Sequence, residues 1–397
     1  MSQKARSQTR LRRCNDVAGA MVGDTFTLLS ASKRRVHQLN HSAAAVWEAI
    51  GDGVAADAIV ETLSNRFAVE RARLFRDVED VVAQLVESGL VAAAPPPEGR
   101  GEFASVVLPA APQISIGPFV GLESLLRIDF VDADASDPDV DSLVSSLARA
   151  LEPLLRDSRP LNIESMSHVH LEVARVEDLW SVSRDGKVVS TWPTTKWLKR
   201  AVLSEVNSGA IAALRSSVAF HAGAVEFPRG IVVFPGKSNA GKSTLVANLL
   251  AHGHRYLTDE AVAIDAADGK AYPFPKSLCL EVGAQGLFPE LRERYPTSET
   301  WDVDPCELST KGSASADIPV AIVFPTYKPG THTKLRALTP NDALAHLLEN
   351  SFDFAAVGGP GAARLLDLAA NTPCFTFVHG GQDAHVDVLE ERFGSLR

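Results

Sequence analysis

Apolar and polar positions in the first hundred residues follow a pattern that predicts strands and then helices. Residues 20–29 and 35–39 are typical of short strands around a polar turn. Apolar residues then recur at helical spacing from Ser42 onward, over residues 55–67 and over residues 74–86. The pattern predicts a small α+β domain in which strands precede three helices.

A run of alanine, proline and glycine follows this domain and cannot continue a helix. We therefore predict a first domain over residues 14–94 and a linker over residues 95–102. Residues 103–217 mix strand-like and helical stretches, and they predict an α+β subdomain that packs on the following core. Its expected elements are strands at 105–108, 126–131 and 170–176, a hairpin around Asp185-Gly186, and helices at 143–155 and 197–214. No residue pattern in this subdomain indicates chemistry.

The third region, residues 218–397, contains the motif G-x-x-x-x-G-K-S at residues 236–243. The apolar run 230–234 precedes it, and residues 244–250 follow with helical spacing, which is the strand–loop–helix setting of a phosphate-binding loop. Backbone N–H groups and the helix N-terminus would hold nucleotide phosphates there. The predicted nucleotide-binding residues are Gly236, Lys237, Ser238, Asn239, Ala240, Gly241, Lys242, Ser243 and Thr244.

Two acidic residues follow this motif after one helix and one short strand. Asp259 ends the strand, and Glu260 comes next, before a further strand at 262–264. Phosphoryl transfer needs oxygen ligands for Mg²⁺ and a carboxylate that accepts a proton from the attacking hydroxyl. Because the phosphate-binding motif lies upstream, we favour this role for Asp259 over a plain turn residue. Glu260 is open between a metal ligand and a surface residue of the same turn.

Composition narrows the classes of function. The formal net charge of -10 argues against nucleic acid as the main partner, and no segment approaches the length of a membrane span. The basic residues near the N-terminus lack an apolar stretch behind them, so they do not form a secretory signal. Four scattered cysteines without C-x-x-C spacing indicate neither a zinc site nor a disulfide framework. We expect a cytoplasmic protein without nucleic-acid or membrane partners.

Residues 39–47, Leu-Asn-His-Ser-Ala-Ala-Ala-Val-Trp, and the closing Glu-Ser-Gly-Leu-Val at 87–91 resemble the PqqD-like domains of peptide-modification pathways. The resemblance implies a winged-helix-like fold that binds the leader of a ribosomally made peptide as an added strand. The implied peptide-binding residues are Val36, His37, Gln38 and Leu39, with Arg73, Arg76 and Asp77 at the rim. A DNA-binding winged helix is the alternative, and the acidic chain disfavours it.

The order His221-Ala-Gly, then the motif at 236–243, then Gly-His-Arg-Tyr-Leu-Thr-Asp-Glu at 253–260 resembles the HPr kinase/phosphorylase family. This resemblance implies an α/β P-loop kinase core of the HPr kinase/PEP carboxykinase type, ATP and Mg²⁺ as cofactors, and an oligomer. It implies that Asp259 is the general base, that Lys242 contacts the phosphates, and that Ser243, Glu260 and Asp259 hold the metal. His221 is open between a place near the phosphates and an ordinary strand residue.

This sequence departs from the family at one position, because Glu260 stands where the family has a second aspartate. The segment associated with phosphorolysis was not found, so we do not expect that activity. Second-rank candidates are Lys276, open between a phosphate contact and a turn residue, together with Lys311, Arg336 and Arg364. Residues 283–315 are predicted to form a long mobile excursion that covers the site.

These patterns together predict an ATP- and Mg²⁺-dependent kinase. Its acceptor would be a Ser or Thr hydroxyl of a precursor peptide held by its leader. Two alternatives remain open at this point. One is a kinase for a small metabolite with a docking domain, and the other is a nucleotide-gated peptide-binding protein without phosphoryl transfer.

Overall fold

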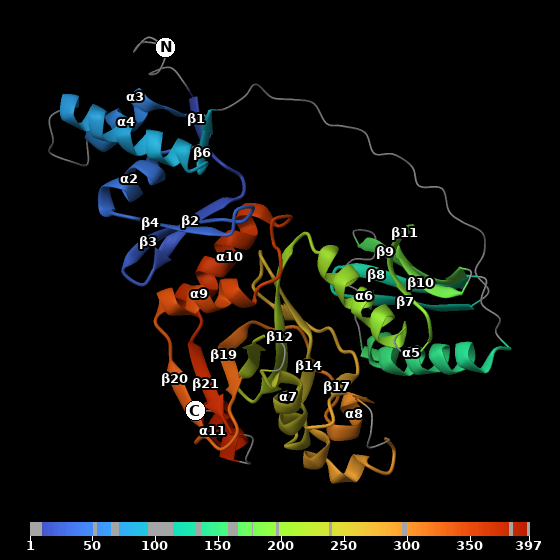
Figure 1. Cartoon of the computed structure of the whole chain (residues 1–397). Coiled ribbons are helices and arrows are strands. Elements are labelled where there is room, and N and C mark those ends of the chain that lie inside the picture. The colour runs from blue at the N-terminus through green and yellow to red at the C-terminus, as the bar shows by residue number, and fades with distance from the viewer. Residues whose placement is uncertain are drawn as a thin grey trace. The chain divides into compact units, whose positions relative to one another are not determined.

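The structure is a computed structural model of the whole chain (Figure 1). Residues are grouped into two compact units, one comprising Met1–Pro109 with Phe354–Ala370 and the other Ala110–Asp353 with Asn371–Arg397. The structure describes residues 10–50, 54–64, 71–93, 114–131, 136–157, 166–176, 178–195, 198–237, 240–295, 300–380 and 384–394. The predicted linker at 95–102 and the predicted strand at 105–108 lie outside the described residues.

The N-terminal unit contains an antiparallel sheet in the order β2-β3-β4 and a second small sheet in the order β5-β1-β6. The predicted strand at 20–29 is in fact a hairpin, because Gly23 with φ 60° allows a tight turn within it. Asn40 caps the first helix by accepting a hydrogen bond from the Ala43 N–H at 2.8 Å. The elements are β1 (Arg10–Arg13), β2 (Val17–Val22), β3 (Thr25–Ser30), β4 (Arg35–Leu39), α2 (His41–Ala49), β5 (Val54–Ala55), α3 (Ala56–Ser64), α4 (Arg71–Glu87) and β6 (Val91–Ala93).

The three helices of this unit close one hydrophobic core over the first strands. Trp47 of α2, Ile59 of α3 and Val78 of α4 are each at most 2% exposed within it. Their spacing is that of the apolar faces predicted from the sequence. The later helix α10 (Gly358–Asn371) contributes to the same unit up to Ala370, and the Gly359 N–H donates to the Asn15 carbonyl at 2.9 Å.

The second unit begins with a five-stranded sheet in the order β11-β10-β9-β8-β7. The predicted hairpin at Asp185-Gly186 is present between β10 and β11, and both turn residues have positive φ. Apolar faces of α5 and α6 pack on this sheet to form its core. The elements are β7 (Ile114–Gly121), β8 (Ser124–Val131), α5 (Pro138–Asp157), β9 (Ser167–Val176), β10 (Leu179–Arg184), β11 (Lys187–Trp192) and α6 (Leu198–Ala212).

An eight-stranded sheet follows in the same unit, in the order β16-β15-β12-β13-β19-β21-β20, with β14 also paired to β12. Strands β13, β19 and β21 run parallel, and apolar residues fill them because both faces are covered. The first elements are β12 (Ser217–Phe227), β13 (Gly230–Pro235), α7 (Lys242–Ala251), β14 (Arg255–Thr258), β15 (Ala261–Asp265) and β16 (Ala271–Tyr272). The later ones are β19 (Pro319–Tyr327), β20 (Lys334–Ala337), α9 (Pro340–Asn350), β21 (Cys374–His379) and α11 (Ala384–Phe393).

The prediction of a long excursion over residues 283–315 is wrong in the described part. Strand β17 (Leu278–Leu280) pairs with β18 (Trp301–Val303), and two 3₁₀ turns and a short helix lie around them. These segments are η2 (Gln285–Leu287), η3 (Pro289–Leu291) and α8 (Pro305–Leu308). Phe288 and Trp301 are 1% exposed, and both join the core around α7. Their burial holds the segment in place.

Among the described residues, no helix is long and apolar enough to cross a membrane. None of the four cysteines, all of which lie in the described part of the chain, forms a disulfide bond. The core of the five-stranded sheet continues into the eight-stranded sheet through Ala219, Ala261 and Phe274. The two sheets of the second unit therefore share buried surface.

Candidate functional site

The motif predicted to bind phosphate lies between strand β13 and helix α7, as its spacing requires. Gly241 caps the helix with φ 84°, and a Cβ there would lie 3.3 Å from the Cβ of Tyr327. A Cβ at Gly236 would lie 3.2 Å from that of Ala240. A side chain at either position would therefore crowd its neighbour. Of the predicted residues, Ser238 and Asn239 lie outside the described part of the chain.

Lys242 is the first residue of α7, and its side chain turns back over the loop. Its Nζ donates to the carbonyl oxygens of Gly236 at 2.7 Å and Lys237 at 2.8 Å. Burial lowers the pKa of Lys242 to about 8, although the carboxylates of Glu260 and Asp259 act in the opposite direction. A cation held at the loop in this way is placed to contact a phosphate bound at the helix N-terminus.

Asp259 follows β14 directly and is 2% exposed. Its Oδ1 accepts a hydrogen bond from the Tyr256 hydroxyl at 3.0 Å, and Lys276 Nζ lies 3.5 Å from the same oxygen. Its Oδ2 is buried and has no hydrogen-bond partner among the described residues. A buried carboxylate oxygen without a partner is costly unless a ligand satisfies it.

Lys276 bridges the two acids instead of pointing at the phosphate loop. Its Nζ lies 3.5 Å from Asp259 Oδ1 and 3.5 Å from Glu260 Oε2. Burial disfavours the charge on Lys276, but the two carboxylates outweigh it and raise the pKa above its usual value. The sequence left this lysine open between a phosphate contact and a turn residue. The structure instead makes it the counter-ion of the acid pair.

Burial also lowers the pKa of His221, and the nearby charge of Lys242 lowers it further, against the opposing effect of Glu260. The ring Nδ1 lies 3.1 Å from the Glu260 carbonyl oxygen. His221 is therefore a neutral imidazole near pH 7, held beside the acid pair by backbone contact. His221 belongs to strand β12 and lines the cleft, and its role near the phosphates stays a prediction.

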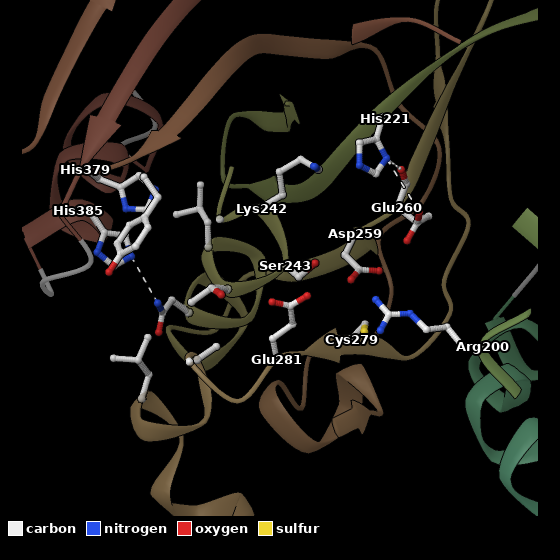
Figure 2. A pocket seen from close by; sticks show the side chains of 18 residues that line it. Arg200, His221, Lys242, Ser243, Asp259, Glu260, Cys279, Glu281, His379 and His385 are labelled. Atoms are coloured by element: carbon white, nitrogen blue, oxygen red, sulfur yellow. Dashed lines mark hydrogen bonds and ion pairs between the residues drawn. The ribbon is translucent and has the colours of Figure 1, made fainter. Parts of the chain in front are cut away.

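These residues face one cleft of about 560 Å³ (Figure 2). Of the predicted site residues, the cleft brings together His221, Gly241, Lys242, Ser243, Thr244, Asp259 and Glu260. Gly236, Lys237 and Ala240 belong to the loop, but they are not among the described residues that line the cleft. Lys311 and Arg336 are also not among the described residues that line the cleft. Arg364 belongs to the other unit, where it pairs with Asp367 at 2.6 Å.

Several lining residues were missed by the sequence analysis. Arg200 of α6 points into the cleft toward Asp259, and Glu281 and Cys279 lie beside it (Figure 2). Burial raises the pKa of the Cys279 thiol to about 11. At the opposite end of the cleft, Figure 2 shows His379 and His385. No local motif marks any of these positions, because each reaches the cleft from an element distant in sequence.

His379 is 3% exposed, and neither ring nitrogen has a hydrogen-bond partner among the described residues. Its ring stacks on Phe377 at 5.3 Å between centroids and lies 5.6 Å from Tyr327. Burial and then the neighbouring His385 lower the pKa of His379 to about 4. It therefore forms a neutral aromatic wall beside Gly241.

The cleft fits a nucleotide with Mg²⁺ on two observations. The glycine-dependent loop leaves the N-terminus of α7 for phosphate, and Asp259 Oδ2 is a buried oxygen without a partner. No group of three or more His, Cys, Asp or Glu side chains forms a metal cage among the described residues. Mg²⁺ rarely needs such a cage, because one or two carboxylates and substrate phosphates commonly complete its ligands.

The residues predicted to bind peptide lie on β4 and α4 of the N-terminal unit. Strand β4 is the edge of its sheet in the described structure, and Val36 is 39% exposed. A pocket beside β4 is lined by Lys33, Arg35, His37, Glu87 and Ser88. Gln38 is exposed on the same strand, Leu39 is half-buried, and Arg73, Arg76 and Asp77 are exposed on α4 but do not line this pocket.

Positive charge surrounds the strand β4. Burial lowers the pKa of His37, and the neighbouring charges of Arg35 and Lys33 lower it further. Lys33 Nζ donates to the Ser88 carbonyl at 2.9 Å and so ties the turn before β4 to the end of α4. The open edge of β4 is suited to pairing with an extended segment.

Comparison with known families identifies this first domain. Residues 26–91 match the family of coenzyme PQQ synthesis protein D (PqqD). The N-terminal part of the chain is a PqqD-like domain. The match covers β3 through the start of β6 and includes β4 and all of α4.

Two solved structures are similar to a small part of the chain. One is TbiB1 in complex with the TbiA(beta) leader peptide, at 20% identity over 21% of this chain and 99% of that chain, with a TM-score of 0.20. The other is lasso peptide synthetase B1 complexed with the leader peptide, at 25% identity over 21% of this chain and 98% of that chain, also with a TM-score of 0.20. No curated protein sequence is significantly similar to this chain.

Proposed function

We propose that this chain is an ATP- and Mg²⁺-dependent kinase that phosphorylates a Ser or Thr hydroxyl of a ribosomally made precursor peptide. The observation that carries the proposal is the cleft in which Asp259 faces the phosphate-binding motif. Lys242 and Ser243 lie on one side of this cleft, and a buried carboxylate with a partnerless oxygen lies on the other. Phosphoryl transfer requires these groups together, whereas phosphate binding alone has no use for a base.

In the proposed reaction, Asp259 accepts the proton of the acceptor hydroxyl. The hydroxyl oxygen then bonds to the γ-phosphorus of ATP, the bond from that phosphorus to the β-phosphate oxygen breaks, and ADP leaves with the electron pair. Lys242 exchanges its carbonyl partners for phosphate oxygens and stabilises their negative charge. Ser243 and Glu260 would hold Mg²⁺, which would neutralise charge on the phosphates.

Lys276 and Tyr256 have a positioning role in this proposal. Both contact Asp259 Oδ1, so Oδ2 is the oxygen left for the acceptor proton. Lys276 also contacts Glu260, so its positive charge lies beside both carboxylates. The longer side chain of Glu260 also lines the cleft, which supports its proposed role as a metal ligand.

The PqqD-like domain supplies the peptide specificity in this proposal. A leader segment pairs with the open edge of β4, where Val36, His37, Gln38 and Leu39 are the contacting strand. Binding of the leader tethers the acceptor segment to the same chain and raises its effective concentration at the cleft, on the order of millimolar for a short flexible tether. The catalytic cleft then needs little affinity of its own for the peptide.

The proposed role of Asp259 as general base can be tested directly by substitution. Phosphate transfer to candidate precursor peptides from the same genomic neighbourhood is measured in a single turnover with ATP and Mg²⁺, in the wild type and in Asp259→Asn. We expect the variant to be slower by roughly 10²- to 10⁴-fold, the usual contribution of a general base. The control is Asp268→Asn in an exposed turn outside the cleft, which should leave the rate unchanged. A full rate in Asp259→Asn would contradict the proposed mechanism.

A further inference from the structure

A second groove opens beside the catalytic cleft, between helix α6 and strand β11 of the five-stranded sheet. It has a volume of about 260 Å³, and its lining includes Ser190 and Trp192 of β11 and Ser204 and Glu205 of α6. Trp192 is half-buried against the core of this sheet, and its Nε1 donates to Ser190 Oγ at 3.1 Å. The groove thus combines a fixed aromatic surface with hydroxyl groups.

Arg200 joins this groove to the cleft, since it lines both of them. The residues around it on α6 are anchored: Leu198 and Val202 are fully buried, and Lys199 forms an ion pair with Asp302 of β18. Arg200 itself makes no hydrogen bond or ion pair within the described residues, and it points at Asp259 (Figure 2). Arg200 therefore lies at the boundary between the two hollows.

Strand β11 also offers backbone groups to a ligand. Among the described strands, β11 has a neighbour on one side only, and Val188 and Val189 on it are 63% and 39% exposed. The pairing of β11 with β10 is interrupted between Val182 and Ser183, which places an irregularity at the level of these valines. An open strand edge with exposed β-branched residues is a surface that extended segments pair with.

We infer that this groove guides the acceptor segment of the precursor peptide into the cleft. This inference rests on the proposed function, which requires a surface for the acceptor segment in addition to the surface for the leader. The acceptor segment lies extended beside β11, an apolar side chain packs on Trp192, and the chain passes Arg200 so that its hydroxyl meets Asp259. The five-stranded sheet, for which the sequence indicated no chemistry, becomes a substrate guide that works after the leader is bound elsewhere.

Two exposed serines on α6 provide a matched experiment. Ser204 lines the groove, whereas Ser208 lies one helical turn further along and does not. The photo-reactive residue p-benzoylphenylalanine is placed at either position in the full chain. The probes are synthetic candidate precursor peptides from the same genomic neighbourhood, with ATP and Mg²⁺, and cross-linked residues are mapped by mass spectrometry.

We expect position 204 to cross-link at least tenfold more than position 208. The modified peptide residues should lie within about six of the phosphorylated hydroxyl, because an extended chain rises about 3.3 Å per residue. In a second measurement, Ser204→Trp should raise the KM for the peptide at least tenfold and leave the KM for ATP unchanged. Ser208→Trp should change neither value.

Equal cross-linking at the two positions, or cross-links confined to the leader, would overturn the inference. So would an unchanged peptide KM in a folded Ser204→Trp variant. These experiments distinguish an incorrect proposal for the groove from an incorrect proposal of kinase activity. Phosphorylation without selective cross-linking at 204 refutes the groove alone, whereas selective cross-linking of the segment after the leader without phosphorylation supports the groove and refutes the kinase.

Discussion

At the scale of single residues, Lys276 has the largest predicted effect on stability. It is the buried counter-ion of Asp259, which is itself 2% exposed, and of Glu260. Removing one partner of a buried ion pair leaves an uncompensated charge. We predict that Lys276→Met lowers the free energy of unfolding by about 3–5 kcal/mol, measured by urea denaturation.

Lys311→Met is the control for this variant, because Lys311 lies on the exposed surface outside the cleft. The double variant Lys276→Met with Asp259→Asn should recover part of the lost stability, since the second change removes the stranded charge. An unfolding free energy for Lys276→Met equal to that of the wild type would mean that the acid pair does not need this lysine.

The lowered pKa of Lys242 predicts that the affinity for ATP depends on pH. Its pKa is lowered to about 8, so the fraction of protonated side chain falls as the pH rises through that value. If the cation holds the phosphates, the Kd for ATP with Mg²⁺ should rise roughly tenfold between pH 7 and pH 9, because about one-tenth of the lysine is then charged. Calorimetric titration measures this dependence.

Lys242→Arg separates this effect from other pH changes, because a guanidinium stays charged over the whole range. The variant should bind ATP with a Kd that is nearly constant from pH 7 to pH 9, whatever its absolute affinity. A Kd that rises equally in both proteins would place the titrating group elsewhere in the cleft.

At the scale of elements, the position of α7 depends on a glycine in the neighbouring strand. A Cβ at Gly223 of β12 would lie 2.6 Å from Val246 Cγ2 of α7, so the helix packs directly on the strand there. We predict that Gly223→Ala displaces α7 and with it Lys242 and Ser243, which weakens ATP binding at least tenfold. Nucleotide titration measures the change.

Gly286→Ala is the matched control for this contact, because a Cβ at Gly286 would meet nothing within 4 Å. It should bind ATP as the wild type does. Equal affinities in Gly223→Ala and the wild type would mean that the strand and helix can separate without disturbing the loop.

Elements that depend on local sequence were predicted, whereas features that depend on distant contacts were not. The strand–loop–helix at the phosphate-binding motif and the hairpin at Asp185-Gly186 were predicted, because both depend on residues that are neighbours in sequence. Residues 283–315 were mispredicted, because their polar and glycine-rich stretches hide Phe288 and Trp301, whose burial depends on distant partners. Arg200 was missed for the same reason, since only the shared core of the two sheets places α6 beside the cleft.

At the scale of the whole molecule, the proposed function assigns leader binding and phosphoryl transfer to different parts of the chain. Tethering should therefore act on apparent affinity and leave the chemical step alone. We predict that removing the leader from the precursor peptide raises its KM by roughly 10²- to 10⁴-fold with kcat nearly unchanged. Steady-state phosphorylation of the full-length and leaderless peptides measures both constants.

Free leader peptide added in trans provides the complementary control. It should inhibit phosphorylation of the full-length peptide by competing for β4 and should not affect the leaderless peptide. A leader that changes neither reaction would indicate that the PqqD-like domain docks a different partner, which is the alternative of a metabolite kinase with a docking module.

The most direct test of phosphoryl transfer to a peptide is mass spectrometry of candidate precursor peptides incubated with the protein, ATP and Mg²⁺. We predict a gain of about 80 mass units on one Ser or Thr of the peptide, present with the wild type and absent with Lys242→Ala. Tight peptide binding that depends on nucleotide but gives no mass gain would contradict the account, and so would ATP consumption that needs only a small hydroxylated metabolite.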